Sequence, residues 1–129
     1  MTSNSTARAT TNLNATAQLL SPGVIEVKCT GHLQAEDSQY LTSLARLIDA
    51  EREPVSIVFD TMEIQSYSHK FPLAHIEVFR KYQRRLRRIA VAHELKSISF
   101  TIATVSLASH TSIKGFPSRE AALAWVREG

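Results

Sequence analysis

Residues 55–60 constrain the fold more than any other part of this chain. They read Val-Ser-Ile-Val-Phe-Asp, a short β-branched run that is almost wholly apolar and ends in a carboxylate. Such a run predicts a strand that is buried on both faces in the interior of a sheet. Open α/β sheets usually keep their ligand or switch sites at the carboxyl edge, so we expect such a site in the segment 61–68.

The segments before this strand predict a hairpin followed by a helix. Two apolar runs, 15–20 and 24–30, flank the turn dipeptide Pro22-Gly23, and Gly31 is expected to end the second strand. Early acidic residues and leucines at 3.6-residue spacing then predict a helix over about 36–51.

The segment 61–68 has no apolar period and is predicted to be a loop. A second helix is expected over about 70–87, with Pro72 in its first turn, where a missing N–H costs little. Ile76, Phe79 and other apolar residues fall on one arc of this helix, and the basic residues fall on the opposite arc.

The remaining elements alternate in the same way. Segments 89–93 and 112–116 predict short strands, and Ser118 is the expected N-cap of a last helix with an apolar side. The segment 98–108 fits a strand by its β-branched content and a helix by its length and its place between two short strands. We choose helix.

The element order β-β-α-β-α-β-α-β-α predicts an α/β fold. It implies a mixed, mostly parallel central sheet with an N-terminal β-hairpin and about four helices. A chain of 129 residues suits one domain, over 13–129. The segment 1–12 is expected to be a disordered tail, since it has no apolar core of a secretory signal. No apolar run reaches membrane-spanning length, and we expect a cytoplasmic protein.

The candidate switch or ligand residues are Asp60, Ser66, Tyr67, Ser68 and His69. A phosphate on a Ser at a helix N-terminus would be stabilised by free N–H groups, but Ser68 also suits the simpler role of an N-cap. A nucleophile set of Ser68, His69 and Asp60 is disfavoured, because adjacent side chains rarely face each other and no glycine-rich elbow is present. We therefore expect no catalytic residues.

Metal and cofactor sites are not indicated either. The five histidines are scattered without i,i+3 or i,i+4 pairs, and His75 is expected to be half-buried on the apolar side of its helix. The four glycines are too dispersed to form a phosphate loop. Cys29, the single cysteine, lies in an apolar strand pattern and is expected to be buried and unreactive.

Six positive charges within residues 80–88 form the strongest surface signal of the sequence, and no acidic residue interrupts them. We expect a basic helix face that includes Arg80, Lys81, Arg84, Arg85 and Arg88. This face would either be solvated and bind nothing, or contact an acidic protein partner or an anionic surface. Nucleic acid is disfavoured, since no aromatic residues suited to base stacking are interleaved with the charges.

Residues 24–129 resemble the STAS domain superfamily, in its SpoIIAA-like branch. The resemblance rests on Val-Lys-Cys-Thr-Gly31, the strand ending Val-Phe-Asp60, Arg-Ile-Ala-Val91, and above all the closing Ile-Lys-Gly-Phe116 strand with its Glu-Ala-Ala-Leu-Ala-Trp125 helix. Switch members of the superfamily carry an Asp-Ser-Ser-Gly turn after the central strand. Here that place reads Gln65-Ser-Tyr-Ser-His-Lys70, with His69 about where their phosphorylated Ser lies.

The resemblance implies a non-catalytic bacterial signalling module that acts through protein–protein contacts, without a cofactor. A different class, a small-ligand or lipid-binding carrier, would use a pocket between the sheet and the helix 70–87. We expect a protein partner, and both a small ligand and a homodimer stay open as alternatives.

Overall fold

The computed structural model describes residues 13–128; the expected tail, 1–12, and Gly129 lie outside the described residues. The elements are β1 (Ala15–Ser21), β2 (Val24–Leu33), the 3-10 helix η1 (Ala35–Tyr40), α2 (Leu41–Ala50), β3 (Val55–Tyr67), α3 (Lys70–Lys81), the 3-10 helix η2 (Gln83–Arg85), β4 (Leu86–Ala92), α4 (Lys96–Ser109), β5 (Ile113–Phe116) and α5 (Arg119–Arg127).

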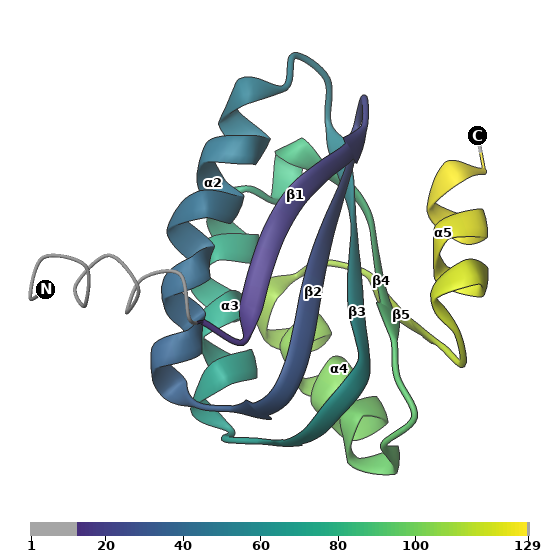
Figure 1. Cartoon of the computed structure of the whole chain (residues 1–129). Helices are drawn as coiled ribbons and strands as arrows, with labels where there is room; N and C mark the ends of the chain where they lie inside the picture. The colour runs from purple at the N-terminus through teal and green to yellow at the C-terminus, as the bar shows by residue number, and fades with distance from the viewer. Residues whose placement is uncertain (1–12, 129) are drawn as a thin grey trace, which may run out of the picture.

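The five strands form one mixed sheet in the order β1-β2-β3-β4-β5 (Figure 1). The β1–β2 hairpin is antiparallel, and all later neighbours are parallel. Gly23, with φ of +80°, supplies the left-handed residue that the hairpin turn requires. The predicted hairpin and the predicted mostly parallel sheet are confirmed.

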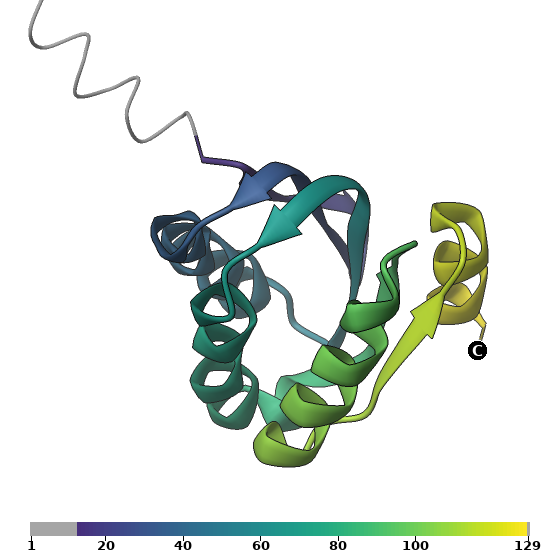
Figure 2. The ribbon, with the colours of Figure 1, turned by 90° about the horizontal axis from the view of Figure 1, so that it is seen from below.

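Helices cover the two faces of the sheet unequally. Each parallel strand is added on the same side of the previous one, so right-handed crossovers place α2, α3 and α4 on one face. Figure 2 shows these three helices on one side and α5 alone on the other. A large apolar core lies under α2, α3 and α4, and a smaller one, with Val58 and Ala90, lies under α5.

The central strand is interior, as the sequence predicts. Residues 55–60 are all buried, and β3 pairs with β2 on one side and β4 on the other. The predicted loop at 61–68 is wrong, however, because β3 continues to Tyr67. It does so by pairing with the end of β2, with His32 opposite Ser66 and Leu33 opposite Tyr67. Gly31, therefore, does not end β2 but lies within it, with φ of +68° beside a register irregularity.

The predicted helix over 70–87 is also wrong in its last third. It ends at Lys81, a single 3-10 turn follows, and Leu86 already pairs with Val55 as the first residue of β4. The residues of α3 that are buried are Phe71, His75 and Phe79. The basic residues of the segment thus belong to three different elements instead of one helix face.

The segment 98–108 is helical, as chosen, because β4 and β5 are parallel neighbours and need a crossover between them. The final helix is confirmed in detail, since the Ser118 hydroxyl accepts a hydrogen bond from the Ala121 N–H at 3.1 Å. Within residues 13–128, none of the helices has the length and apolar character needed to cross a bilayer.

Candidate functional site

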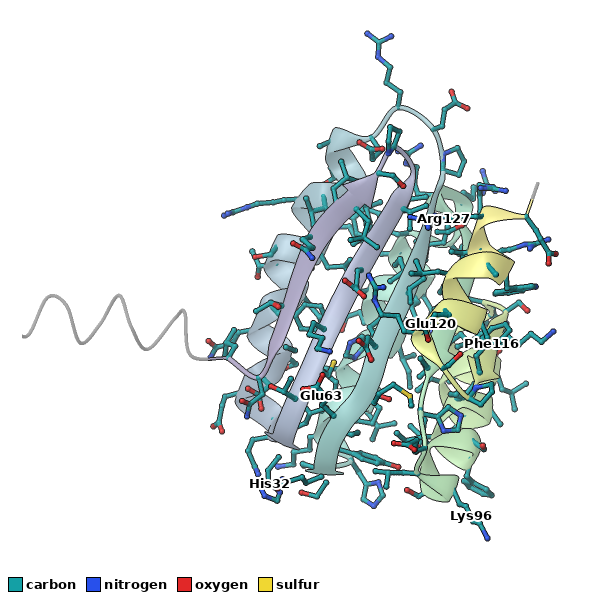
Figure 3. All side chains as sticks on the ribbon, turned by 45° about the vertical axis from the view of Figure 1, so that its right-hand side comes forward. His32, Glu63, Lys96, Phe116, Glu120 and Arg127 are labelled. Carbon is teal, nitrogen blue, oxygen red and sulfur yellow. The ribbon has the colours of Figure 1, made fainter. Side chains whose placement is uncertain are left out.

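Asp60 lies on the opposite face of the sheet from the helix α3 that follows it. It is buried beside α5, where its carboxylate accepts hydrogen bonds from Lys28 Nζ at 2.9 Å and from the Met62 N–H at 3.1 Å. Lys28 Nζ also pairs with the Glu63 carboxylate at 2.8 Å. Figure 3 shows Glu63 on this face of the sheet. Hydrogen bonds to both carboxylates raise the pKa of Lys28 above its ordinary value. Asp60 therefore acts within an ion-pair group and does not meet Ser68 or His69.

Ser66 lies at the exposed end of β3 and meets a residue that the sequence did not single out. Its hydroxyl is 2.7 Å from His32 Nδ1 on β2. A Ser–His distance of this size is within reach for proton transfer, but a nucleophile also needs a substrate pocket and oxyanion donors. Neither residue lines the apolar cavity of this end of the fold.

The other predicted loop residues make local contacts. Ser68 Oγ accepts a hydrogen bond from the Lys70 N–H at 3.3 Å. Lys70 is the first residue of α3, so Ser68 satisfies one backbone donor at the start of this helix. The Tyr67 hydroxyl lies 2.9 Å from Thr101 Oγ1 and 3.2 Å from Ser97 Oγ, which ties β3 to α4. His69 is exposed and lies edge-on to the Tyr67 ring at 6.1 Å.

Arg85 braces the end of another helix. Its guanidinium donates to the carbonyl oxygens of Ile48, Glu51 and Arg52 at the C-terminus of α2. A cation there satisfies carbonyls that have no partner within the helix and opposes the negative end of the helix dipole. This contact also explains why α3 does not continue through Arg85.

Arg88 is likewise engaged within the fold. It donates to the Trp125 carbonyl at 2.5 Å, lies 4.8 Å from the centroid of the Trp125 ring, and pairs with Glu128 at 3.6 Å. Two of the five predicted partner-binding residues therefore hold elements of the fold together.

Exposed side chains follow one face of α3 and the turn after it. On a helix, residues 70, 73, 77, 80 and 81 fall within an arc of about 100°, and residue 84 follows in η2. We name this surface the α3 stripe, and it consists of Lys70, Leu73, Glu77, Arg80, Lys81 and Arg84. It carries four cations and one carboxylate, and Leu73 in its first half is 48% exposed.

An apolar cavity of about 90 Å³ lies between the sheet, α3 and α4. Its walls come from β3, from the buried side of α3 and from the facing side of α4, including Phe59, Phe79, Ile98 and Val105. Apolar cavities of this order stay dry or take a few apolar atoms of a ligand.

His75 forms part of the cavity wall and is 4% exposed, more deeply buried than the sequence suggests. Its Nδ1 lies 2.9 Å from the Phe71 carbonyl, which can only accept, so Nδ1 donates and Nε2 accepts from the Tyr40 hydroxyl at 2.6 Å. Burial lowers the pKa of His75 to about 4, and burial raises the pKa of Tyr40 well above its ordinary value. The imidazole is therefore a neutral, fully bonded part of the core.

Other potential reactive groups are also accounted for. Cys29 is buried, as predicted, and burial raises the pKa of its thiol to about 12, which disfavours the reactive thiolate at neutral pH. Across residues 13–128, no group of three or more His, Cys, Asp or Glu side chains is placed to hold a metal ion.

Sequence reasoning missed Tyr40, the α4 side of the cavity and the His32–Ser66 contact. The spacing of Phe71, His75 and Phe79 at i, i+4 and i+8 was the available signal for the buried side of α3. The contacts to Tyr40 and His32 span more than 30 residues and leave no local pattern.

Comparison with known proteins gives a family. The family described as SpoIIAA-like matches residues 24–127, which is most of the chain. No curated protein matches.

Two solved structures share the fold. One is a protein of the DUF3478 family with a SpoIIAA-like fold from Shewanella loihica PV-4, at 16% identity and a TM-score of 0.64, over 87% of this chain and 91% of that one. The other is the anti-sigma factor antagonist SpoIIAA in its unphosphorylated form, at 11% identity and a TM-score of 0.65, over 89% of this chain and 99% of that one. The chain belongs to the SpoIIAA-like family.

Proposed function

We propose that this chain is a non-catalytic bacterial regulatory module that binds a protein partner through the α3 stripe. The observation that carries the proposal is the stripe itself, a continuous exposed surface on a fold shared with an anti-sigma factor antagonist. The set of Ser68, His69 and Asp60, which the sequence already disfavours as a nucleophile set, gives no support for an enzyme: Asp60 pairs with Lys28, Ser68 accepts from the Lys70 N–H, and His69 lies against the Tyr67 ring.

The charge of the stripe indicates the kind of partner. Four cationic side chains and one carboxylate favour an acidic protein surface, and the exposed Leu73 offers an apolar contact beside them. Residues 66–69 lie at the N-terminal end of the stripe, and this segment is the proposed switch. Detection of phosphate on Ser66 or Ser68 in protein from native cells would support the switch, and its absence under all growth states would exclude it.

Reversing Arg80 and Arg84 to Glu is expected to weaken the partner complex by about tenfold or more and to reduce its salt dependence. The partner is first captured from native cells with the unchanged chain and identified by mass spectrometry. Its purified form is then titrated with each variant at several salt concentrations.

The matched control for this measurement is Arg46→Glu with Arg127→Glu, which makes the same change in net charge at exposed residues of α2 and α5. Figure 3 labels Arg127 on α5. The control pair should bind as the unchanged chain does. Equal affinity for the Arg80/Arg84 variant and the unchanged chain would contradict the proposal.

A second function, the binding of a small apolar molecule, is favoured by the cavity beside His75. Its location between the sheet and α3 is the one that a carrier or sensor of this type requires. From the sequence, such a pocket is expected beside both His75 and Tyr82. Tyr82 does not line this cavity, and its hydroxyl donates to Asp49 at 3.0 Å.

Val105→Phe is expected to fill this cavity and abolish retention of a small apolar molecule while the chain stays folded, because Val105 is 5% exposed in its wall. Native mass spectrometry of gently purified protein measures the retained mass. Leu107→Phe, on the exposed side of the same helix, is the control and should retain the molecule. If the unchanged chain carries no added mass, the carrier function is excluded.

A further inference from the structure

The outer face of α4 exposes two large apolar side chains. Phe100 and Leu107 are each 80% exposed, well above the 48% of Leu73 on α3. They are seven residues apart, which is two helical turns, so both point to the same side of the helix. The buried residues Ile98 and Val105 point to the opposite side, towards the core. Figure 2 shows α4 at one end of the row formed by α2, α3 and α4.

No charge interrupts this outer face. Lys96, the first residue of α4, is the only charged residue of the helix. The side chains between Phe100 and Leu107 on the exposed side are small, Ala103 and Thr104. The Thr104 hydroxyl already donates to the Phe100 carbonyl at 3.2 Å, so covering it leaves no unpaired donor. The face can therefore be buried against another apolar surface without removing a charge from water.

We propose that this face binds the same face of a second copy of the chain, with the two α4 helices antiparallel across a two-fold axis. In such a contact each residue meets a counterpart equally far beyond the axis. With the axis between Ala103 and Thr104, Phe100 of each copy meets Leu107 of the other. The small residues at the crossing point let the two helices approach closely, and two identical Phe–Leu contacts flank them.

The charges of α4 favour the same arrangement. In this register position 96 of one copy lies opposite position 111 of the other, just beyond the C-cap His110. The last turn of α4 contains no basic residue of its own. Lys96 of the second copy therefore supplies a cation at the negative end of the helix dipole. Figure 3 shows Lys96 at the end of α4, pointing away from the fold.

The size of the face predicts a weak dimer. The 14 residues of α4 make a helix about 21 Å long. A single helix pair of this length buries less than the total of about 1,600 Å² found in standard interfaces. The two Phe–Leu contacts are its central anchors, and we expect a dissociation constant of about 10–100 μM. The inference does not rest on the proposed function, because the α3 stripe contains none of these residues.

Sedimentation equilibrium of the full chain, from about 5 to 500 μM, measures this dimer across the range that its expected dissociation constant requires. The unchanged chain should follow a monomer–dimer curve. Phe100→Gln and Leu107→Gln should each raise the dissociation constant about tenfold or more, because each removes a partner from both symmetric contacts. Leu73→Gln, at the exposed leucine of α3, is the control and should dimerise as the unchanged chain does.

Cross-linking tests the antiparallel register. Cys29 is buried, so a cysteine added on α4 is the accessible thiol of the described chain. An equimolar mixture of Phe100→Cys and Leu107→Cys chains should form an interchain disulfide under mild oxidation. Either chain alone should not, because the two copies of position 100 lie about 10 Å apart along the helices, beyond the reach of a disulfide.

Four results would overturn the proposal. The unchanged chain could remain a monomer at every concentration, or the dimer could persist in both Gln variants. Either Cys chain alone could cross-link as well as the mixture. A monomeric chain that binds phosphatidylcholine vesicles, and loses them in Phe100→Gln, would assign the face to lipid instead.

Discussion

Lowering the pH from 7 to 4 is expected to reduce the free energy of unfolding by up to about 3 kcal/mol through His75 alone. Burial lowers the pKa of this imidazole to about 4 in the folded chain, against an ordinary value of 6.5. The unfolded chain therefore takes up a proton first. The contribution of neutral His75 is complete above pH 6.5 and is lost as the pH falls towards 4.

The surroundings of the His75 ring explain why it binds a proton weakly. A protonated ring would place a charge among Phe59, Phe71 and Phe79, whose centroids lie 4.9 to 5.7 Å from that of His75. It would also set an Nε2–H against the Tyr40 hydroxyl, which now donates to that nitrogen. The Tyr40 hydroxyl would have to turn away, within a site that gives it no water.

Urea unfolding of the unchanged chain and of His75→Gln at pH 7, 6, 5 and 4 measures this contribution. The difference between the two chains should narrow steadily below pH 6.5, because the carboxylates titrate in both and cancel. If the difference between the two chains stays constant from pH 7 to 4, then His75 takes up its proton over the same pH range in the folded and the unfolded chain, and the account of this site is wrong.

Phe79→Ala is expected to lower the free energy of unfolding by about 3–5 kcal/mol, the largest effect of any substitution proposed for this chain. Phe79 is 2% exposed, meets Phe59 edge-on at 6.1 Å, and forms part of the cavity wall. Its loss removes buried apolar surface and enlarges a space that is already not filled by protein atoms.

Leu73→Ala on the same helix is the matched control, since Leu73 is 48% exposed and makes its contacts at the surface. Its effect should stay near 0.5 kcal/mol. Chemical denaturation of the two variants measures their free energies of unfolding, which can be compared directly if the m-values are equal. Equal losses for Phe79 and Leu73 would show that α3 does not pack by the side that carries Phe71, His75 and Phe79.

The parts of the fold that local chemistry determines could be predicted from the sequence. The apolar, β-branched run 55–60 is suited to a strand in the interior of a sheet, where it is found. The dipeptide Pro22-Gly23 specifies a turn. Ser118 caps α5 through its own neighbours. These features depend on a few consecutive residues, so the pattern alone is sufficient.

The errors arose where distant residues decide the outcome. The end of β3 has no apolar period, yet it is a strand because β2 extends alongside it. The helical pattern through 87 is broken by the bond of Arg85 to the end of α2 and by the pairing of Leu86 with Val55. The basic residues therefore divide between the α3 stripe and structural braces, a division that the charge pattern could not show.

The most direct test of the central claim is hydrogen–deuterium exchange of the chain alone and in complex with its captured partner. The account predicts that slower exchange on binding centres on residues 66–85, which include the α3 stripe, and that peptides from α5 are unchanged. Protection confined to α5 or to the β1 edge, with 66–85 exchanging as in the free chain, would contradict it.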